Sequence, residues 1–192
     1  PNFTNIKKSK ETSPCKRTVM AKPEELIVTH ISNFRKVKRI DDVVRIFYGI
    51  QQKLPAKLIM VGDGPEREIA DQLCKDLGIK SKVLFLGNTS DIDRILCFTD
   101  LFLLPSASSE SFGLSALEAM AAGVPVVSSN TGGLPEVNEE GVSGYLCPIG
   151  DVKAMAEKAI YILEDKTRLA QFKQNARKVA ERFDEDRIVP MY

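Results

Sequence analysis

Short apolar runs alternate with longer amphipathic stretches along most of the chain. The apolar runs are rich in Val, Ile and Leu and predict buried strands, whereas apolar residues spaced three and four apart predict helices. The predicted strands are 26–31, 57–61, 82–86, 100–104, 125–128 and 145–147; the predicted helices are 40–53, 65–77, 91–98, one that begins near 113, 151–163 and 166–183. Repeated strand–helix units favour right-handed crossovers and a parallel sheet covered on both faces. The predicted fold class is therefore α/β.

Composition places this sheet in one domain of an ordinary globular protein. The chain has 192 residues, of which 43% are hydrophobic and 28% charged, with a net charge of +1. These values give no case for a nucleic-acid or membrane-surface partner. No apolar run is long enough to cross a bilayer and no signal peptide opens the chain, so we expect a cytoplasmic protein. Residues 1–23 are polar and Lys-rich and are interpreted as a linker, and residues 24–192 as the domain.

The cysteines and the histidine argue against a metal centre. The four cysteines are scattered without a C-x-x-C pair, and His30 is the single histidine. We therefore expect reduced, partly buried thiols and no metal cofactor.

The stretch from Pro105 to Pro125 joins two predicted strands through a small-residue loop and a helix that begins near Gly113. A helix N-terminus at the carboxyl end of a parallel strand presents free N–H groups to a phosphate. The residues that would present them are Ser111, Phe112, Gly113 and Leu114. Glu110 and Glu118, with seven residues between them, could accept hydrogen bonds from sugar hydroxyls. Either acid alone is better explained as a solvated residue, but two acids beside one loop favour a ligand site.

The block from Glu110 to Val127, which reads E-S-F-G-L-x-x-L-E at its start, and the segment from Gly132 to Val137 closely resemble the E-x7-E region of retaining glycosyltransferases of family four. The match runs from about residue 26 to about residue 183. It implies a Rossmann-like domain that is the C-terminal, donor-binding half of a GT-B enzyme. It also implies a UDP-sugar donor, no metal and front-face attack by the acceptor. By resemblance, Glu110 orients the sugar and Glu118 holds the ribose.

The loop after the first predicted strand, Ser32 to Arg39, is basic. Its cations could neutralise a diphosphate, although a solvated loop is an equally good interpretation. In the family an Arg and, five residues later, a Lys contact the diphosphate. Lys38 matches the Lys, whereas Asn33 stands at the Arg position, and whether Arg35 or Arg39 compensates is left open. Lys38 and Glu110 are thus the catalytic candidates.

The same loop resembles that of the enzymes that join N-acetylglucosamine to L-malate in bacillithiol biosynthesis. The resemblance implies UDP-N-acetylglucosamine as donor and L-malate as acceptor, with the acceptor bound mainly by an N-terminal domain that this chain lacks. We therefore expect the chain alone to bind UDP weakly and not to turn over. Whether the full-length protein is a homodimer is left open.

Two further loops belong to the predicted donor cleft. The Gly62–Gly64 segment begins like a dinucleotide fingerprint, but Arg67 occupies the third glycine position. A tight turn is the better interpretation, with a secondary role in lining the cleft. Thr89, in the loop after the third strand, is predicted near the uracil; an ordinary turn with Ser90 as helix N-cap explains that loop equally well.

Other functions remain as alternatives. The domain could transfer to another acceptor, a glycan or a lipid, or act as a stand-alone nucleotide-sugar-binding module. A UDP-sugar 2-epimerase is disfavoured by the E-x7-E block, and a nicotinamide dehydrogenase by the broken glycine fingerprint.

Overall fold

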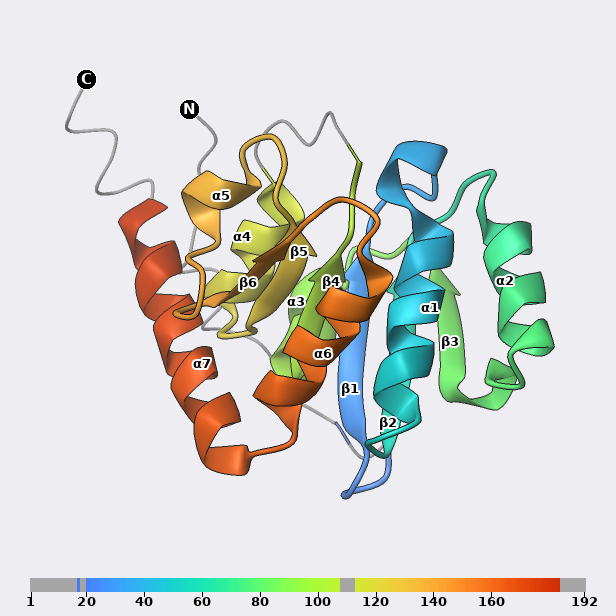
Figure 1. Ribbon diagram of the computed structural model, residues 1–192, viewed down its shortest axis with the longest axis horizontal. Coiled ribbons are helices and arrows are strands. Elements are labelled where there is room, and N and C mark those ends of the chain that lie inside the picture. Colours follow the sequence, from blue (N-terminus) through green and yellow to red (C-terminus); the bar gives the residue numbers. More distant parts are fainter. Residues whose placement is uncertain (1–16, 18–19, 108–112, 184–192) are drawn as a thin grey trace.

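A computed structural model describes residues 17, 20–107 and 113–183 of the chain (Figure 1). The strands are β1 (Leu26–Ile31), β2 (Ala56–Val61), β3 (Val83–Gly87), β4 (Leu101–Leu104), β5 (Val126–Ser129) and β6 (Gly144–Cys147). The α-helices are α1 (Ile40–Gln51), α2 (Arg67–Asp76), α3 (Ile92–Phe98), α4 (Leu114–Ala121), α5 (Leu134–Val137), α6 (Val152–Leu163) and α7 (Lys166–Ala180). Short 3-10 helices are η3 (Lys36–Lys38), η4 (Lys80–Lys82) and η5 (Glu181–Phe183).

The six strands form one parallel sheet in the order β3-β2-β1-β4-β5-β6. The chain builds the sheet outward from β1 to β3, then returns to the other side of β1 and builds outward again. The strand order therefore reverses between β1 and β4, and in such sheets ligands bind outside the carboxyl ends of the strands at this reversal. The predicted parallel α/β fold is confirmed.

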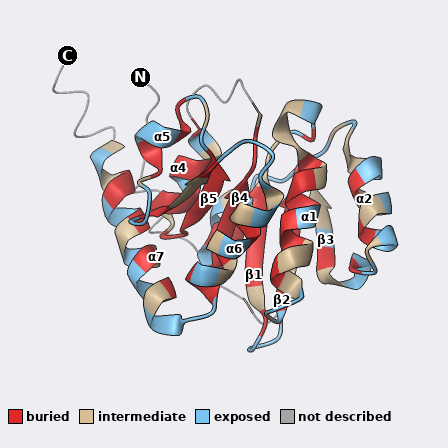
Figure 2. Ribbon diagram, viewed as in Figure 1, coloured by how far each residue is buried: buried red, intermediate tan, exposed pale blue. Residues whose placement is uncertain are grey.

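Helices cover both faces of the sheet (Figure 1). One apolar core packs α1, α2 and α6 against one face, and a second packs α4 and the end of α7 against the other. The central strands are almost completely buried (Figure 2), which explains why they read as continuous apolar runs rather than alternating ones.

Some element boundaries differ from those expected. Helix α2 begins at Arg67, two residues later than predicted, because Glu66 N–H donates to the carbonyl of Phe34 at 3.0 Å and holds the preceding residues in a turn. Asp91, not Ser90, is the N-cap residue of α3, and Thr89 Oγ1 accepts from the Asp91 N–H at 3.1 Å.

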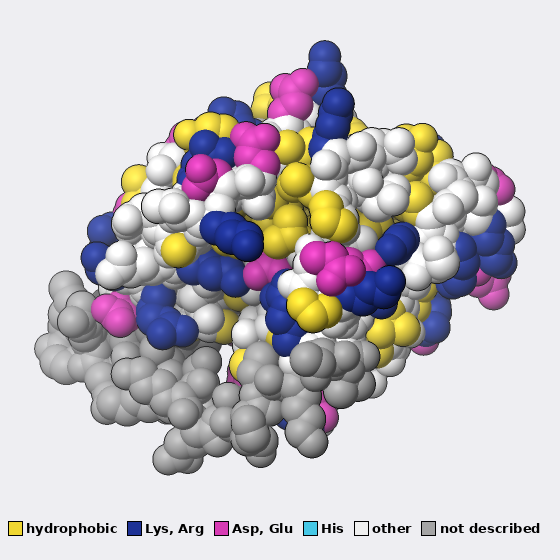
Figure 3. Space-filling model, turned by 90° about the horizontal axis from the view of Figure 1, so that it is seen from below, with side chains coloured by type: hydrophobic (Ala, Val, Ile, Leu, Met, Phe, Trp, Pro, Cys, Tyr) yellow, Lys and Arg dark blue, Asp and Glu magenta, His cyan; other side chains and the backbone are white. Residues whose placement is uncertain are grey.

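The amino edge of the sheet is held by two buried acids. Glu25 bonds Lys82 at 2.7 Å, and Asp100 bonds Lys173 and Arg17, each at 2.7 Å. The face seen from below in Figure 3 accordingly shows Lys and Arg side chains interspersed with acids. Arg17, within the segment interpreted as a linker, is thus bound to the domain.

The thiols are not all reduced. Cys74 and Cys147 are free and buried, as expected, and burial raises the pKa of each to about 11. Cys97, however, is disulfide-bonded, which corrects the expectation at that position.

Candidate functional site

The loops that follow β1 and β4 meet at the carboxyl edge of the sheet, where the strand order reverses. The N–H of Ala107, in the loop after β4, donates to the carbonyl of Val37, in the loop after β1, at 2.8 Å. This bond joins η3, which carries Lys38, to the segment that leads into α4. The structure therefore brings together the two loops that the sequence singled out separately.

The glycines after β2 support the loop after β1 from the other side. A side chain at Gly62, which has φ +124°, would place its Cβ only 1.8 Å from the carbonyl oxygen of Ser32. A Cβ at Gly64 would lie 2.7 Å from the carbonyl oxygen of Phe34, whose ring is fully buried. These contacts favour the interpretation of Gly62 as a residue that permits close packing in a tight turn.

The cations of the first loop have different surroundings. Arg39 is the single non-glycine residue of the described part of the chain with a positive φ, 50°, and its Nε donates to Oδ2 of Asp42 at 2.5 Å. Burial nevertheless raises the pKa of Asp42, against the opposing effect of Arg39. Lys38 is half-buried, whereas Arg35 and Asn33 are exposed. Of the two arginines suggested as a substitute for the missing diphosphate ligand, Arg39 is therefore engaged elsewhere.

Helix α4 begins at Leu114, close to the predicted start. Gly113 is its N-cap, with φ +72°, and has no side chain with which to cap the helix. A Cβ at Gly113 would lie 2.6 Å from Cδ2 of Leu134 in α5, so glycine suits both the backbone conformation and the packing. The side chain of Leu114 is exposed at the same end. Helix α4 therefore begins on the carboxyl side of β4, where the first-turn N–H groups stay the predicted phosphate ligands.

Glu118 lies one turn further along α4 and faces the start of α3. The side chain as a whole is exposed, but protein atoms around its carboxyl raise the pKa above the ordinary value, and the charge of Asp93 raises it further. Asp93 belongs to the first turn of α3. Glu118 therefore lies near the start of α3, the helix that follows the loop containing Thr89. Glu118 and Thr89, the residues predicted to contact the ribose and the uracil, are thus on the same side of the domain.

Glu110, Ser111 and Phe112 lie outside the described residues. The structure consequently positions Lys38, Gly113, Leu114, Glu118 and Thr89 around one edge of the sheet, but it does not test the role of Glu110 or the first two N–H donors. Within the described ranges, no three His, Cys, Asp or Glu side chains gather as metal ligands would, and no helix is long and apolar enough to cross a membrane.

His30, considered from the sequence only as a metal ligand, lies near the carboxyl end of β1, beside the candidate site. It is fully buried in β1, and its ring nitrogens lie 2.8 Å from the carbonyl oxygen of Leu103 and 2.7 Å from Oγ of Ser32. A buried, polar residue immediately before a strand end was the signal that could have identified it.

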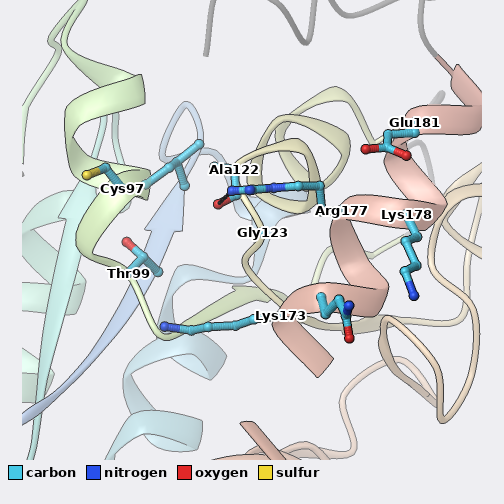
Figure 4. Close-up of a pocket in the computed structure, with 10 residues that line it drawn as sticks. Cys97, Thr99, Ala122, Gly123, Lys173, Arg177, Lys178 and Glu181 are labelled. Carbon is cyan, nitrogen blue, oxygen red and sulfur yellow. Dashed lines mark hydrogen bonds between the residues drawn. The ribbon is translucent and has the colours of Figure 1, made fainter. Parts of the chain in front are cut away.

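A separate pocket of about 510 Å³ lies between α3, α4 and α7 (Figure 4). Its lining residues Thr99 and Gly123 directly precede β4 and β5, so it is at the amino edge. Lys173, which lines it, bonds Asp100, and Arg177 donates to the carbonyl of Ala122 at 3.3 Å. No residue of the predicted donor site lines this pocket, and its position differs from that of ligands in such sheets.

Comparison with known proteins shows which family the chain resembles. Residues 16–179 match the family model of the glycosyl transferases group 1. The chain is 47% identical over 169 residues to N-acetyl-alpha-D-glucosaminyl L-malate synthase of Bacillus anthracis, covering 88% of this chain and 44% of that protein. It is 40% identical over 143 residues to D-inositol 3-phosphate glycosyltransferase of Mycobacterium marinum, covering 70% of this chain and 30% of the relative. The chain thus spans less than half the length of these relatives.

A solved structure shows the same fold. Anabaena HepE in complex with UDP-glucose has a TM-score of 0.88 and 28% identity, with 99% of this chain and 54% of that chain covered.

Proposed function

The chain belongs to the group 1 glycosyl transferases, and from this premise we propose that it is the donor-binding half of an enzyme that transfers a sugar from a UDP-sugar with retention of configuration. In the longer protein the donor is UDP-N-acetylglucosamine and the acceptor is L-malate. The support for this choice is the identity to the Bacillus anthracis synthase and the resemblance of the Ser32–Arg39 loop.

The observation that carries the proposal is the junction of two loops at the reversal of strand order. The Ala107–Val37 hydrogen bond holds η3 beside the segment that leads towards α4. This contact supports the proposal that Lys38 and the N-terminus of α4 bind the same diphosphate, since a cation and a helix N-terminus both stabilise a phosphate. A dinucleotide cofactor would require the glycine fingerprint that Arg67 interrupts.

The chemistry follows from where charge develops. As the bond between the sugar and the β-phosphate breaks, negative charge accumulates on the UDP leaving group. Lys38 and the N–H groups of the first turn of α4 stabilise that charge and take the part that a metal ion plays elsewhere. Glu118 accepts hydrogen bonds from the ribose hydroxyls, and Glu110 orients the transferred sugar without attacking it.

The test is calorimetry on the longer protein with UDP, UDP-glucose and UDP-N-acetylglucosamine, followed by the addition of L-malate. Loss of the ribose contacts in Glu118→Ala should weaken UDP binding about tenfold, since one or two hydrogen bonds to a charged group are lost. Glu157→Ala, an exposed acid on α6, is the matched control and should leave UDP affinity unchanged. Glu110→Ala should retain UDP affinity but lose the preference for the sugar.

The outcomes separate the alternatives. Transfer to L-malate supports the proposal in full. Transfer only to a glycan or lipid acceptor supports the proposed UDP-sugar donor and refutes L-malate as the acceptor. UDP binding without transfer to any acceptor would favour a nucleotide-sugar-binding module. An unchanged UDP affinity in Glu118→Ala would contradict the ribose role.

A further inference from the structure

Strands β1 and β4 separate before either strand ends. Their pairing covers Val28 with Leu101 and Thr29 with Phe102. On the outer sides both strands continue: β1 pairs with β2 up to Ile31 and Val61, and β4 pairs with β5 up to Leu104 and Ser128. The sheet therefore opens along its middle just before the carboxyl edge, at the place where the donor site begins.

The imidazole of His30 spans this opening. Its Nδ1 lies 2.8 Å from the carbonyl oxygen of Leu103 in β4, and because a carbonyl can only accept, Nδ1 carries the proton. In the neutral ring Nε2 is then the acceptor for the hydroxyl of Ser32, 2.7 Å away. A single buried side chain thus joins the end of β4 to the first residue of the loop after β1.

The contact with Ser32 fixes more of the loop than one residue. Because the one hydroxyl hydrogen of Ser32 is donated to Nε2, the carbonyl oxygen of Asn33, 3.1 Å from Ser32 Oγ, accepts instead from the N–H of Arg35 at 2.8 Å. The His30 ring lies 6.3 Å from the ring of Phe34, centroid to centroid, and both side chains are fully buried. The start of the loop is consequently fixed by the contact of Ser32 with His30, and the part near its end by the hydrogen bond from Ala107 to Val37.

We propose that His30 is a positioning residue for the nucleotide donor: it spans the gap between β1 and β4 and fixes the Ser32–Arg39 loop in the conformation that presents Lys38 to the diphosphate. This role rests on the proposed function. His30 itself is buried beneath the loop and acts through its contacts with Ser32 and Leu103.

Substitution of His30 by Asn or Gln tests the hydrogen bonds of its two ring nitrogens separately. In His30→Asn the amide nitrogen replaces Nδ1 and retains the bond to Leu103, but the shorter side chain loses Ser32. In His30→Gln the amide reaches the position of Nε2 and retains Ser32. Thr29→Val is the matched control, because Thr29 is equally buried in the same strand and loses one hydrogen bond, the 2.8 Å contact with Thr99.

Two measurements apply to all variants, hydrogen exchange on this chain and calorimetry on the longer protein. Amide hydrogen exchange by NMR follows the loop without any ligand, at the N–H groups of Arg35, Lys38 and Arg39, which are bonded within the loop. Calorimetry with UDP follows the site. We expect His30→Asn to accelerate exchange at these amides about tenfold and to weaken UDP binding about fivefold. His30→Gln should keep the exchange rates and the UDP affinity of the unmodified protein. Thr29→Val should lower the melting temperature without changing the exchange rates or the UDP affinity.

The exchange rates test the positioning role of His30 without any bound nucleotide, and so independently of the donor function. If His30→Asn changes the exchange rates of the loop amides and the UDP affinity no more than Thr29→Val does, the positioning role of His30 is refuted and the donor function stands. If His30→Gln is as impaired as His30→Asn, the link through Ser32 is wrong. If the longer protein without substitution binds neither UDP nor a UDP-sugar, the donor function fails, and faster exchange in His30→Asn would support only the hold of His30 on the loop.

Discussion

Arg39 and Asp42 form a short charged hydrogen bond, 2.5 Å from Nε to Oδ2, at the start of α1. The Asp42 side chain is almost fully buried, and the guanidinium also lies beside Gly150, where a Cβ would approach it to 3.2 Å. Arg39 is therefore a structural residue that ends η3 and begins α1. This finding removes Arg39 from the candidate diphosphate ligands of the loop and leaves Lys38 and Arg35.

Substitution of the neighbouring cations Arg39 and Lys38 should separate folding from binding. Arg39→Gln leaves the buried carboxylate of Asp42 without its cation and should lower the free energy of unfolding by about 1–2 kcal/mol, a value below that of a fully buried pair because Arg39 is partly exposed. Lys38→Gln should cost little stability but reduce UDP affinity about tenfold. Urea denaturation and calorimetry measure the two effects, and the reverse assignment would show that Arg39 binds the donor.

The pKa of Glu118 should control how UDP binding depends on pH. The carboxylate form accepts the ribose hydroxyls, and because burial and Asp93 raise this pKa, affinity should begin to fall at a higher pH than an ordinary Glu would give. Asp93→Asn removes the like charge and should move the acid limb of the binding curve to lower pH. Asp91→Asn, an exposed acid that pairs with Arg94, is the control. An acid limb unmoved by Asp93→Asn would contradict the coupling.

Glu25 should make stability fall in acid. Hydrogen bonds from Lys82 and from the N–H of Lys22 hold its pKa at about 2, below the ordinary 4.5. A lowered folded-state pKa means that the stabilisation is complete above pH 4.5 and is lost as the pH falls towards 2. Its partners are partly exposed, so we expect on the order of 1–3 kcal/mol. Urea denaturation of the unmodified chain and Glu25→Gln should give free energies that differ above pH 5 and converge near pH 2; a constant difference would refute this.

Two glycines with positive φ should respond differently to alanine. Gly78→Ala meets no atom within 4 Å and should cost only the conformational strain, about 1 kcal/mol. Gly62→Ala adds a 1.8 Å clash with the carbonyl oxygen of Ser32 and should cost several kcal/mol more or prevent folding. Urea denaturation compares them. Equal losses would show that the two loops can move apart freely.

The sequence was sufficient where the signal is local. Apolar runs and helical periodicity predicted the parallel sheet and most helices, because each element is specified by its own residues. The start of α4 at Leu114 followed from a glycine between a strand and an apolar helix. The UDP-sugar interpretation came from the E-x7-E resemblance, and the family match agrees with it.

What the sequence left undetermined depends on contacts between distant segments. The bond of Arg39 to Asp42 could not be distinguished from a contact with a diphosphate, since both need a cation in the same loop. His30 was missed because its partner in β4, Leu103, is 73 residues away and contributes only a backbone carbonyl. The sequence could not show that Gly62 packs against Ser32, because the two residues belong to different loops.

The charge pairs of Glu25 and Asp100 lie at the end of the sheet opposite the loops that we propose bind the nucleotide. Much of the electrostatic anchoring of the domain is thus physically separate from substrate recognition. Such a division lets the loops diversify, and so exchange one sugar donor for another, while the framework beneath them keeps its resistance to unfolding.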